Sequence, residues 1–173
     1  MDTKIAAEAT ATTDRTMIER ASELELLITR TVDGPRDVVF KAWTDAELFR
    51  QWWVPKSFGL NLLSCEIDAR VGGGYRLTFD TGTAEPMAFF GRYLEVTPPS
   101  HLVWTNEEAD GSTVVTTAAL EDDGGRTRVV IRDRYPSKDA LDEALASGAT
   151  SWNPETFDQL DELLAELGAR TRH

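Results

Sequence analysis

The sequence predicts an α+β protein in which a curved antiparallel sheet of about seven strands wraps around a long C-terminal helix. Three observations predict this fold. One strand is followed at once by two short helices, six strand-like segments then follow with short turns between them, and a stripe of apolar residues at helical spacing lies near the C-terminus. Connections this short join antiparallel neighbours, because a parallel crossover needs about a dozen residues or more.

The first strand and the two short helices follow from the spacing of apolar residues. Every second residue from 24 to 28 is apolar, as in a strand with one buried face. Pro35 suits the first position of a helix. Thr44 and Glu47 then predict a second helix start, with the side chain of Thr44 as its cap and that of Glu47 reaching back to it. Pro55 is expected to end this second helix.

The rest of the sheet is predicted from six segments separated by Gly, Pro and Asp. The segments span residues 60–68, 74–81, 87–97, 101–106, 113–120 and 127–135. Tyr75, Leu77 and Phe79 alternate with polar residues, which is typical of a strand with one apolar face. Such a face has to be covered by another element of the fold.

The C-terminal helical stripe is the element long enough to cover the sheet. Residues 137–146 predict a helix of their own, and Asn153-Pro154-Glu155 predicts a fresh helix start. Local chemistry therefore predicts two helices with Trp152 at the joint. A single helix that is kinked near Pro154 is the alternative. We expect a flexible tail over residues 1–22 and a single domain over residues 23–173.

Composition narrows the classes of function. The chain has 173 residues, with 30 acidic and 18 basic side chains and a formal net charge of -12, so we expect no binding to nucleic acid. No apolar run reaches the roughly 20 residues of a membrane span, and no secretory signal is recognisable, so we expect a cytoplasmic protein. One cysteine, Cys65, and two histidines predict neither a disulfide nor a metal site, and we expect no cofactor.

Several motifs in the correct order resemble one protein family. They are GPRDVVFKAWTD at 34–45, WWVP at 52–55, DARVGG at 68–73, GRYLEVTP at 91–98, LVWT at 102–105, and the spaced Gly148, Trp152, Leu160, Leu163 and Leu164. They resemble homologues of the C-terminal domain of the activator of the ninety-kilodalton heat-shock chaperone's ATPase, in the helix-grip (START-like, SRPBCC) superfamily. The resemblance covers about residues 24–167. It implies the helix-grip fold with a cavity between sheet and C-terminal helix. It implies no single activity, since polyketide cyclases, pollen allergens and lipid-transfer domains share the superfamily.

Aromatic and apolar residues on the predicted inner face are the candidate ligand-binding residues. They are Trp52, Trp53, Tyr75, Leu77, Phe79, Phe90, Trp104 and Trp152. Each has ordinary core packing as its alternative, and consecutive residues on a helix point about 100° apart, so Trp52 and Trp53 cannot both face the core squarely. Phe89 is an alternative to Phe90, because residues 87–96 are apolar on both faces and a bulge near Gly91 would change their register.

Asp133 and Tyr135 are the candidate catalytic residues. The alternation that buries Val129 and Ile131 places both on the inner face. A carboxyl group buried there without a cation would have a raised pKa and would be able to act as an acid or a base. The alternative is that the strand frays, leaving Asp133 in water or paired with Arg134.

Binding of a small hydrophobic or aromatic molecule, without assigned catalysis, is the function that the residues favour. One alternative is a cyclase- or hydrolase-like enzyme of the same fold. Another is a chaperone co-factor or other protein-interaction module. The full-length eukaryotic activator has a separate N-terminal chaperone-binding domain, and residues 1–22 are too few to form one, so we expect this role to be the less favoured. A homodimer formed through a sheet edge is compatible with the pattern.

Overall fold

The protein is described by a computed structural model that covers residues 9–12, 16–54, 56, 61–80, 82, 86–107, 113–146 and 152–171, with the backbone alone at 9–12, 152–154 and 169–171. The strands are β1 (Ala9–Thr12), β2 (Thr16–Arg20), β3 (Glu25–Val32), β4 (Asn61–Ile67), β5 (Gly74–Asp80), β6 (Met87–Thr97), β7 (His101–Glu107), β8 (Thr113–Asp123) and β9 (Arg126–Arg134). The helices are α1 (Arg36–Thr44), α2 (Ala46–Trp52), α3 (Lys138–Ala146) and α4 (Trp152–Thr171).

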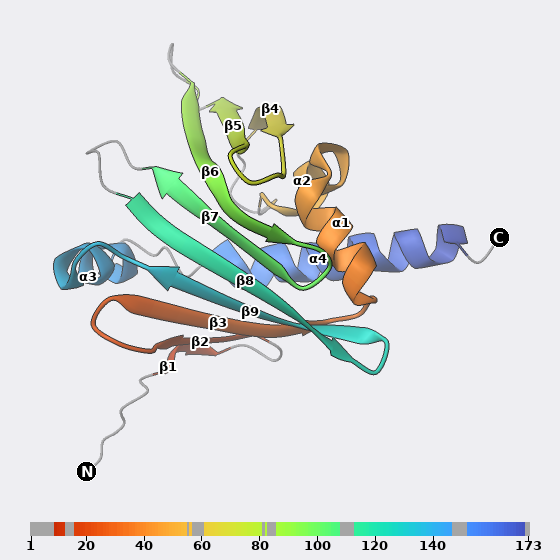
Figure 1. Ribbon diagram of the computed structural model, residues 1–173, viewed down its shortest axis with the longest axis horizontal. Helices are drawn as coiled ribbons and strands as arrows, with labels where there is room; N and C mark the ends of the chain where they lie inside the picture. The colour runs from red at the N-terminus through yellow and green to blue at the C-terminus, as the bar shows by residue number, and fades with distance from the viewer. Residues whose placement is uncertain are drawn as a thin grey trace.

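A strongly curved sheet forms the body of the molecule, and α4 lies along one of its faces (Figure 1). Within the described residues the strand order is β1-β2-β3-β9-β8-β7-β6-β5-β4, and all neighbouring strands are antiparallel. Phe157, Leu160 and Leu164 of α4 are buried in the same core as Ile28 and Ile131 of the sheet. The α+β helix-grip fold predicted from the sequence is therefore confirmed. Among the described helices, none combines the length and the apolar character needed to cross a membrane.

The sheet has more strands than expected, because residues assigned to a flexible tail pair with its edge. β2 is antiparallel to β3, with Ile18 opposite Ile28. Thr16 and Ile18 are 1% and 0% exposed. The expectation of a tail through residue 22 is wrong for Thr16–Arg20. The alternation of buried and exposed residues in this strand is too short to be distinguished from a coil by sequence alone.

The second helix starts one residue later than predicted. Asp45, and not Thr44, is the cap: its side chain accepts hydrogen bonds from the backbone N–H groups of Glu47 (2.9 Å) and Leu48 (3.4 Å). The hydroxyl of Thr44 donates instead to the carbonyl oxygen of Phe40 at 3.0 Å. Thr44 is still the last helical residue of α1, whereas Asp45 has the extended backbone that a cap requires.

The C-terminal region forms two helices, as local chemistry predicts, and not one kinked helix. α3 ends at Ala146 and α4 begins at Trp152. Pro154 therefore lies in the first turn of α4, where a helix leaves its backbone N–H groups unpaired in any case. A proline at this position interrupts no hydrogen bond of the helix.

β6 contains a bulge, which lies at Leu94 and not near Gly91. Its pairing with β7 shifts between Tyr93 and Glu95. Before the bulge, the inward-facing residues include Tyr93, which is 5% exposed; after it, Val96 packs on the core. Gly91 has a different role, since a Cβ atom there would lie 1.7 Å from the backbone carbonyl oxygen of Thr105.

Gln159 of α4 fastens this helix to the segment that follows α2. Its Nε2 donates to the carbonyl oxygens of Trp52 (2.9 Å) and Val54 (2.8 Å), and its Oε1 accepts from the backbone N–H of Lys56 (2.9 Å). The carbonyl groups at a helix end need partners. One amide thus satisfies three backbone groups and holds Trp53, which lies between two of them.

Arg30 of β3 holds α4 against the part of the sheet formed by β2 and β3. Its guanidinium group is 1% exposed and donates to Thr16 (2.9 Å), Asp158 (2.9 Å) and Asp161 (2.5 Å). A buried cation is tolerated when it is paired and hydrogen-bonded in this way. Together, Arg30 and Gln159 fix the position of α4 relative to both halves of the sheet.

Candidate functional site

A pocket of about 320 Å³ lies between the sheet and the two short helices. Its described lining residues are Trp43, Phe49, Trp53, Ile67, Tyr75, Leu77, Phe89, Phe90, Tyr93, Trp104, Asn106, Glu107, Thr116, Ile131 and Asp133. They come from α1, the end of α2 and strands β4 to β9, whereas no described residue of α4 is among them. The expected cavity between sheet and C-terminal helix is thus displaced towards α1 and α2. α4 packs beneath these residues: the ring of its Phe157 lies 6.4 Å from that of Trp43.

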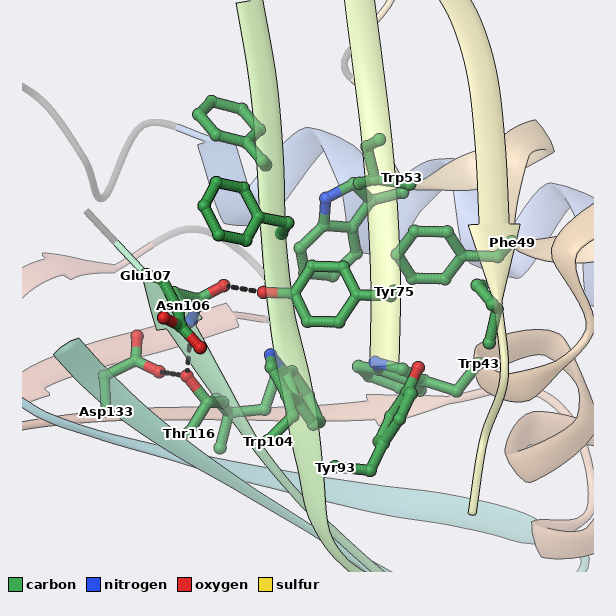
Figure 2. A pocket seen from close by; sticks show the side chains of 15 residues that line it. Trp43, Phe49, Trp53, Tyr75, Tyr93, Trp104, Asn106, Glu107, Thr116 and Asp133 are labelled. Atoms are coloured by element: carbon green, nitrogen blue, oxygen red, sulfur yellow. Dashed lines mark hydrogen bonds between the residues drawn. The ribbon is translucent and has the colours of Figure 1, made fainter. Parts of the chain in front are cut away.

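The apolar wall of the pocket is a connected set of aromatic rings. Phe49 and Trp53 are stacked with their ring centroids 4.9 Å apart. Tyr75 and Tyr93 meet edge to face at 6.0 Å, and Figure 2 shows both rings turned towards the space between the strands. Aromatic side chains of this kind offer broad, rigid contact surfaces for a guest.

The pocket reaches the surface beside β6. Phe89 and Phe90 both line it and are 38% and 42% exposed. Phe89 packs on Phe79 at 5.3 Å, whereas Phe90 lies under the guanidinium group of Arg76, 5.6 Å from ring centroid to Cζ. Both phenylalanines therefore border the opening. The sequence left open which of the two lines the pocket, and the structure shows that both do.

A polar corner faces the aromatic wall. Figure 2 shows Asn106, Glu107, Thr116 and Asp133 gathered on one side of the pocket. The hydroxyl of Tyr75 contacts Oδ1 of Asn106, Nδ2 of Asn106 donates to Thr116 at 3.1 Å, and the hydroxyl of Thr116 donates to Oδ1 of Asp133 at 2.6 Å. The result is a chain of hydrogen bonds that ends on a carboxylate.

Burial and hydrogen bonding act on the pKa of Asp133 in opposite directions. Desolvation raises the pKa, and the hydrogen bond from Thr116 lowers it by a smaller amount, so that the pKa rises from 3.8 to about 6. Asp133 is half-buried, and the alternative in which the strand frays at Asp133 does not occur, because β9 continues to Arg134. Burial also raises the pKa of Tyr93, so its phenol is neutral at physiological pH.

Six of the residues singled out from the sequence line the pocket. They are Trp53, Tyr75, Leu77, Phe90, Trp104 and Asp133. Trp52 and Phe79 lie in the core instead, each 0% exposed; the indole Nε1 of Trp52 donates to the carbonyl oxygen of Ala42 at 3.0 Å. Tyr135 follows the end of β9 and packs against the core without lining the pocket. The side chain of Trp152 lies outside the described residues.

Several lining residues were not predicted, and the sequence contains a signal for some of them. Asn106 continues the alternation of Leu102 and Trp104 along β7. Thr116 lies between the buried Val114 and Ala118 along β8. Trp43 and Phe49, on α1 and α2, are not among the candidates named from the sequence. Alternation along β6 did not identify Tyr93, because the bulge that follows it changes which positions of the strand face inward.

No constellation suited to a metal ion occurs in the part of the chain that the structure describes. No group of three or more His, Cys, Asp or Glu residues there is arranged so that it could hold a metal ion. Cys65 is half-buried on β4, and burial raises the pKa of its thiol to about 11. A thiol of this kind is a poor nucleophile at neutral pH, because the thiolate is the reactive form.

Comparison with known proteins identifies the family. The model of the activator of Hsp90 ATPase homolog 1-like proteins matches residues 33–165. The chain belongs to this family. The matched segment runs from the end of β3 into α4, so that it includes every lining residue of the pocket. No curated protein matches the sequence.

Solved structures of bacterial proteins have the same fold. A protein from Rhodobacter sphaeroides is 22% identical with a TM-score of 0.80, over 88% of this chain and 99% of that one. A protein from Nitrosomonas europaea is 25% identical with a TM-score of 0.75, over 86% and 98%. A third, from Mycobacterium smegmatis, is 21% identical with a TM-score of 0.70, over 82% and 91%. The family and the similar solved structures agree on the architecture. The activity has to be argued from the pocket.

Proposed function

We propose that the protein binds a small aromatic molecule in the pocket between the sheet and helices α1 and α2. The observation that supports this function best is the wall of aromatic side chains around a space of about 320 Å³. This volume lies at the lower end of the roughly 300–1,000 Å³ typical of small-molecule sites. A mainly apolar lining with a few converging polar groups is also typical of such sites.

The exposed rim of β6 offers a matched pair of variants to test binding. Phe90→Ala removes one wall of the opening, whereas Leu94→Ala removes a comparably exposed apolar side chain of the same strand (42% and 52% exposed) that does not line the pocket. A neutral aromatic alcohol, naphthalen-2-ylmethanol, serves as the probe, and its affinity is measured by isothermal titration calorimetry. We expect Phe90→Ala to weaken binding about tenfold, because the contact area of one aromatic ring is lost, and Leu94→Ala to leave it unchanged.

Two results would contradict the proposal. If the probe does not bind the wild-type protein at any accessible concentration, the pocket is not an aromatic binding site. If Leu94→Ala weakens binding as much as Phe90→Ala does, the probe binds to the exposed apolar surface of β6 and not to the pocket. Native mass spectrometry of the freshly purified protein adds an independent measurement, since a guest held in the pocket gives an adduct that is lost on denaturation.

A second candidate function is acid–base catalysis on a bound substrate, as in a cyclase-like enzyme of this fold. It is favoured by Asp133, whose pKa of about 6 lies close to the pH at which a general acid or base works best. Tyr135, the other candidate, is not among the lining residues. NMR titration of the Asp133 carboxyl group tests this function directly. An ordinary pKa near 3.8 would remove the reason for proposing it.

A further inference from the structure

The charges that line the pocket are all of one sign. Of its described lining residues, Asp133 and Glu107 are acidic, and no Lys, Arg or His is among them. Among the described residues, Glu107 pairs with Arg92, whose Nε lies 3.5 Å from the carboxylate, and the side chain of Arg92 is 72% exposed. A guest with a negative charge would therefore meet two carboxylates, with basic side chains only outside the pocket.

Asp133 has hydrogen-bonding capacity that the described residues do not use. Thr116 is its hydrogen-bond donor among the described residues, and that bond ends on Oδ1. The second oxygen, Oδ2, has no donor in the described part of the chain, and it is not one of the buried unpartnered atoms, which are Nε of Arg30 and Nε1 of Trp43. Oδ2 is thus exposed to solvent, and because Asp133 lines the pocket, a charged donor on a guest would be a strong partner for this carboxylate.

The indole of Trp104 is a second polar group that has no partner among the described residues. The residue is 7% exposed and lines the pocket, and its Nε1–H has no acceptor among the described residues. Figure 2 shows this nitrogen on the edge of the ring that points to the side of the pocket where Asn106 and Thr116 lie. A polar group of a guest, or a water molecule beside it, is needed to complete this corner of the site.

The aromatic wall favours positive charge as well as apolar surface. The faces of Trp and Tyr rings carry negative potential and attract ammonium groups within about 6 Å. Trp53, Tyr75 and Trp104 line the pocket together with Asp133. Aromatic faces beside a carboxylate, without a competing basic side chain, are the combination that selects an organic cation.

We propose that the guest is a protonated aromatic amine, with its ammonium group on Oδ2 of Asp133 and its ring against Trp53, Tyr75 and Trp104. This assignment rests on the proposed binding function and adds the charge of the ligand to it. The pKa of Asp133, about 6, leaves its carboxylate mostly ionised at neutral pH. The hydrogen-bond chain from Tyr75 through Asn106 and Thr116 then holds the carboxylate in place.

Three probes of nearly equal shape separate the role of charge from that of aromatic surface. They are naphthalen-2-ylmethanamine, a cation at neutral pH; naphthalen-2-ylmethanol, which is neutral; and 2-naphthoate, an anion. Calorimetric titrations at about pH 7.5 use the wild-type protein and Asp133→Asn, with Asp122→Asn as the control. Asp122 lies exposed on β8 outside the pocket, so this variant makes the same chemical change elsewhere.

We expect the amine to bind the wild-type protein at least about tenfold more tightly than the alcohol, since both donate to the carboxylate but only the ammonium group adds the attraction between opposite charges. The naphthoate is expected to bind most weakly. Asp133→Asn should abolish the difference between amine and alcohol. Asp122→Asn should keep the difference.

Equal binding of amine and alcohol by the wild-type protein would overturn the inference and leave the proposed binding function intact. A preference for the amine that survives Asp133→Asn but disappears in Glu107→Gln would overturn the assignment to Asp133. Failure of all three probes to bind would reject the binding function itself. The two proposals therefore fail in distinguishable ways.

Discussion

Replacing Asp133 by Asn is expected to stabilise the protein at neutral pH while removing its preference for a cationic guest. In the folded state the pKa of Asp133 is raised from 3.8 to about 6, chiefly by desolvation. The folded protein therefore favours the protonated carboxyl group. The stability that the protonated carboxyl group of Asp133 contributes is fully present below about pH 3.8. This contribution declines as the pH rises towards 6 and is lost above that pH.

The magnitude follows from the size of this shift. One pKa unit corresponds to about 1.36 kcal/mol, so ionisation of Asp133 costs the folded state roughly 2–3 kcal/mol at most. Asparagine has the same shape, still accepts the hydrogen bond from Thr116, and carries no charge to desolvate. We expect Asp133→Asn to exceed the wild-type protein in unfolding free energy by about 1–3 kcal/mol near pH 8, and by almost nothing near pH 4.

Urea denaturation followed by circular dichroism between about pH 4 and pH 8 measures this difference. Comparing the two proteins at each pH removes the pH dependence that both share. Asp122→Asn, on the exposed part of β8, should show no pH-dependent gain. A difference between Asp133→Asn and wild type that is independent of pH, or a loss of stability at pH 8, would refute the reasoning that burial raises the pKa.

Three further predictions concern the frame around the pocket. Gln159→Ala leaves three backbone groups of the segment after α2 without partners, and urea denaturation should show a loss of about 2–4 kcal/mol that the exposed Glu162→Ala does not share. Gly91→Ala places a Cβ atom 1.7 Å from a carbonyl oxygen of β7, so a lowered melting temperature is expected; Gly168→Ala, with nothing within 4 Å, should leave it unchanged or raised. Cys65, with a thiol pKa of about 11, should react with iodoacetamide far more slowly than free cysteine at about pH 7.5; an equal rate would show that the thiol is not buried.

The architecture was predictable because it depends on long, regular patterns. Alternation in the strands, short polar turns and one C-terminal apolar stripe each span many residues, so single exceptions do not disturb them. The two C-terminal helices were predicted for the same kind of reason, since Asn153 and Pro154 form a strong start signal. Elements set by few residues were less predictable. Thr16–Arg20 contributes a strand only because β3 offers an unpaired edge, which is a tertiary property.

The pocket was predicted in part, and the errors have physical causes. Alternation placed Tyr75, Leu77 and Trp104 correctly, because each lies in an unbroken strand. Helix geometry predicts that Trp52 and Trp53 point in different directions. Which of them faces the pocket depends on how α2 packs against its neighbours. Trp52 packs edge to face on Trp43 of α1 at 4.8 Å, which directs it into the core.

The polar corner was predicted only through Asp133, since hydrogen bonds between strands require knowledge of the register. Thr116 lies opposite Asp133 in the β8–β9 pairing. Asn106 is opposite Val114, two residues from Thr116 and on the same face of the sheet. A one-residue change of register in either pairing would turn these side chains to the other face of the sheet. The raised pKa of Asp133, and the oxygen that no described residue contacts as a donor, therefore became visible only with the structure.

Binding of an aromatic guest in this pocket is tested most directly by NMR observation of the indole N–H groups during titration with naphthalen-2-ylmethanol. Trp53 and Trp104 line the pocket, whereas Trp52 is 0% exposed and its indole donates to Ala42 at 3.0 Å. We predict that the indole signals of Trp53 and Trp104 shift with increasing probe and that the signal of Trp52 stays in place. Unchanged signals of Trp53 and Trp104 at saturating probe would contradict the account.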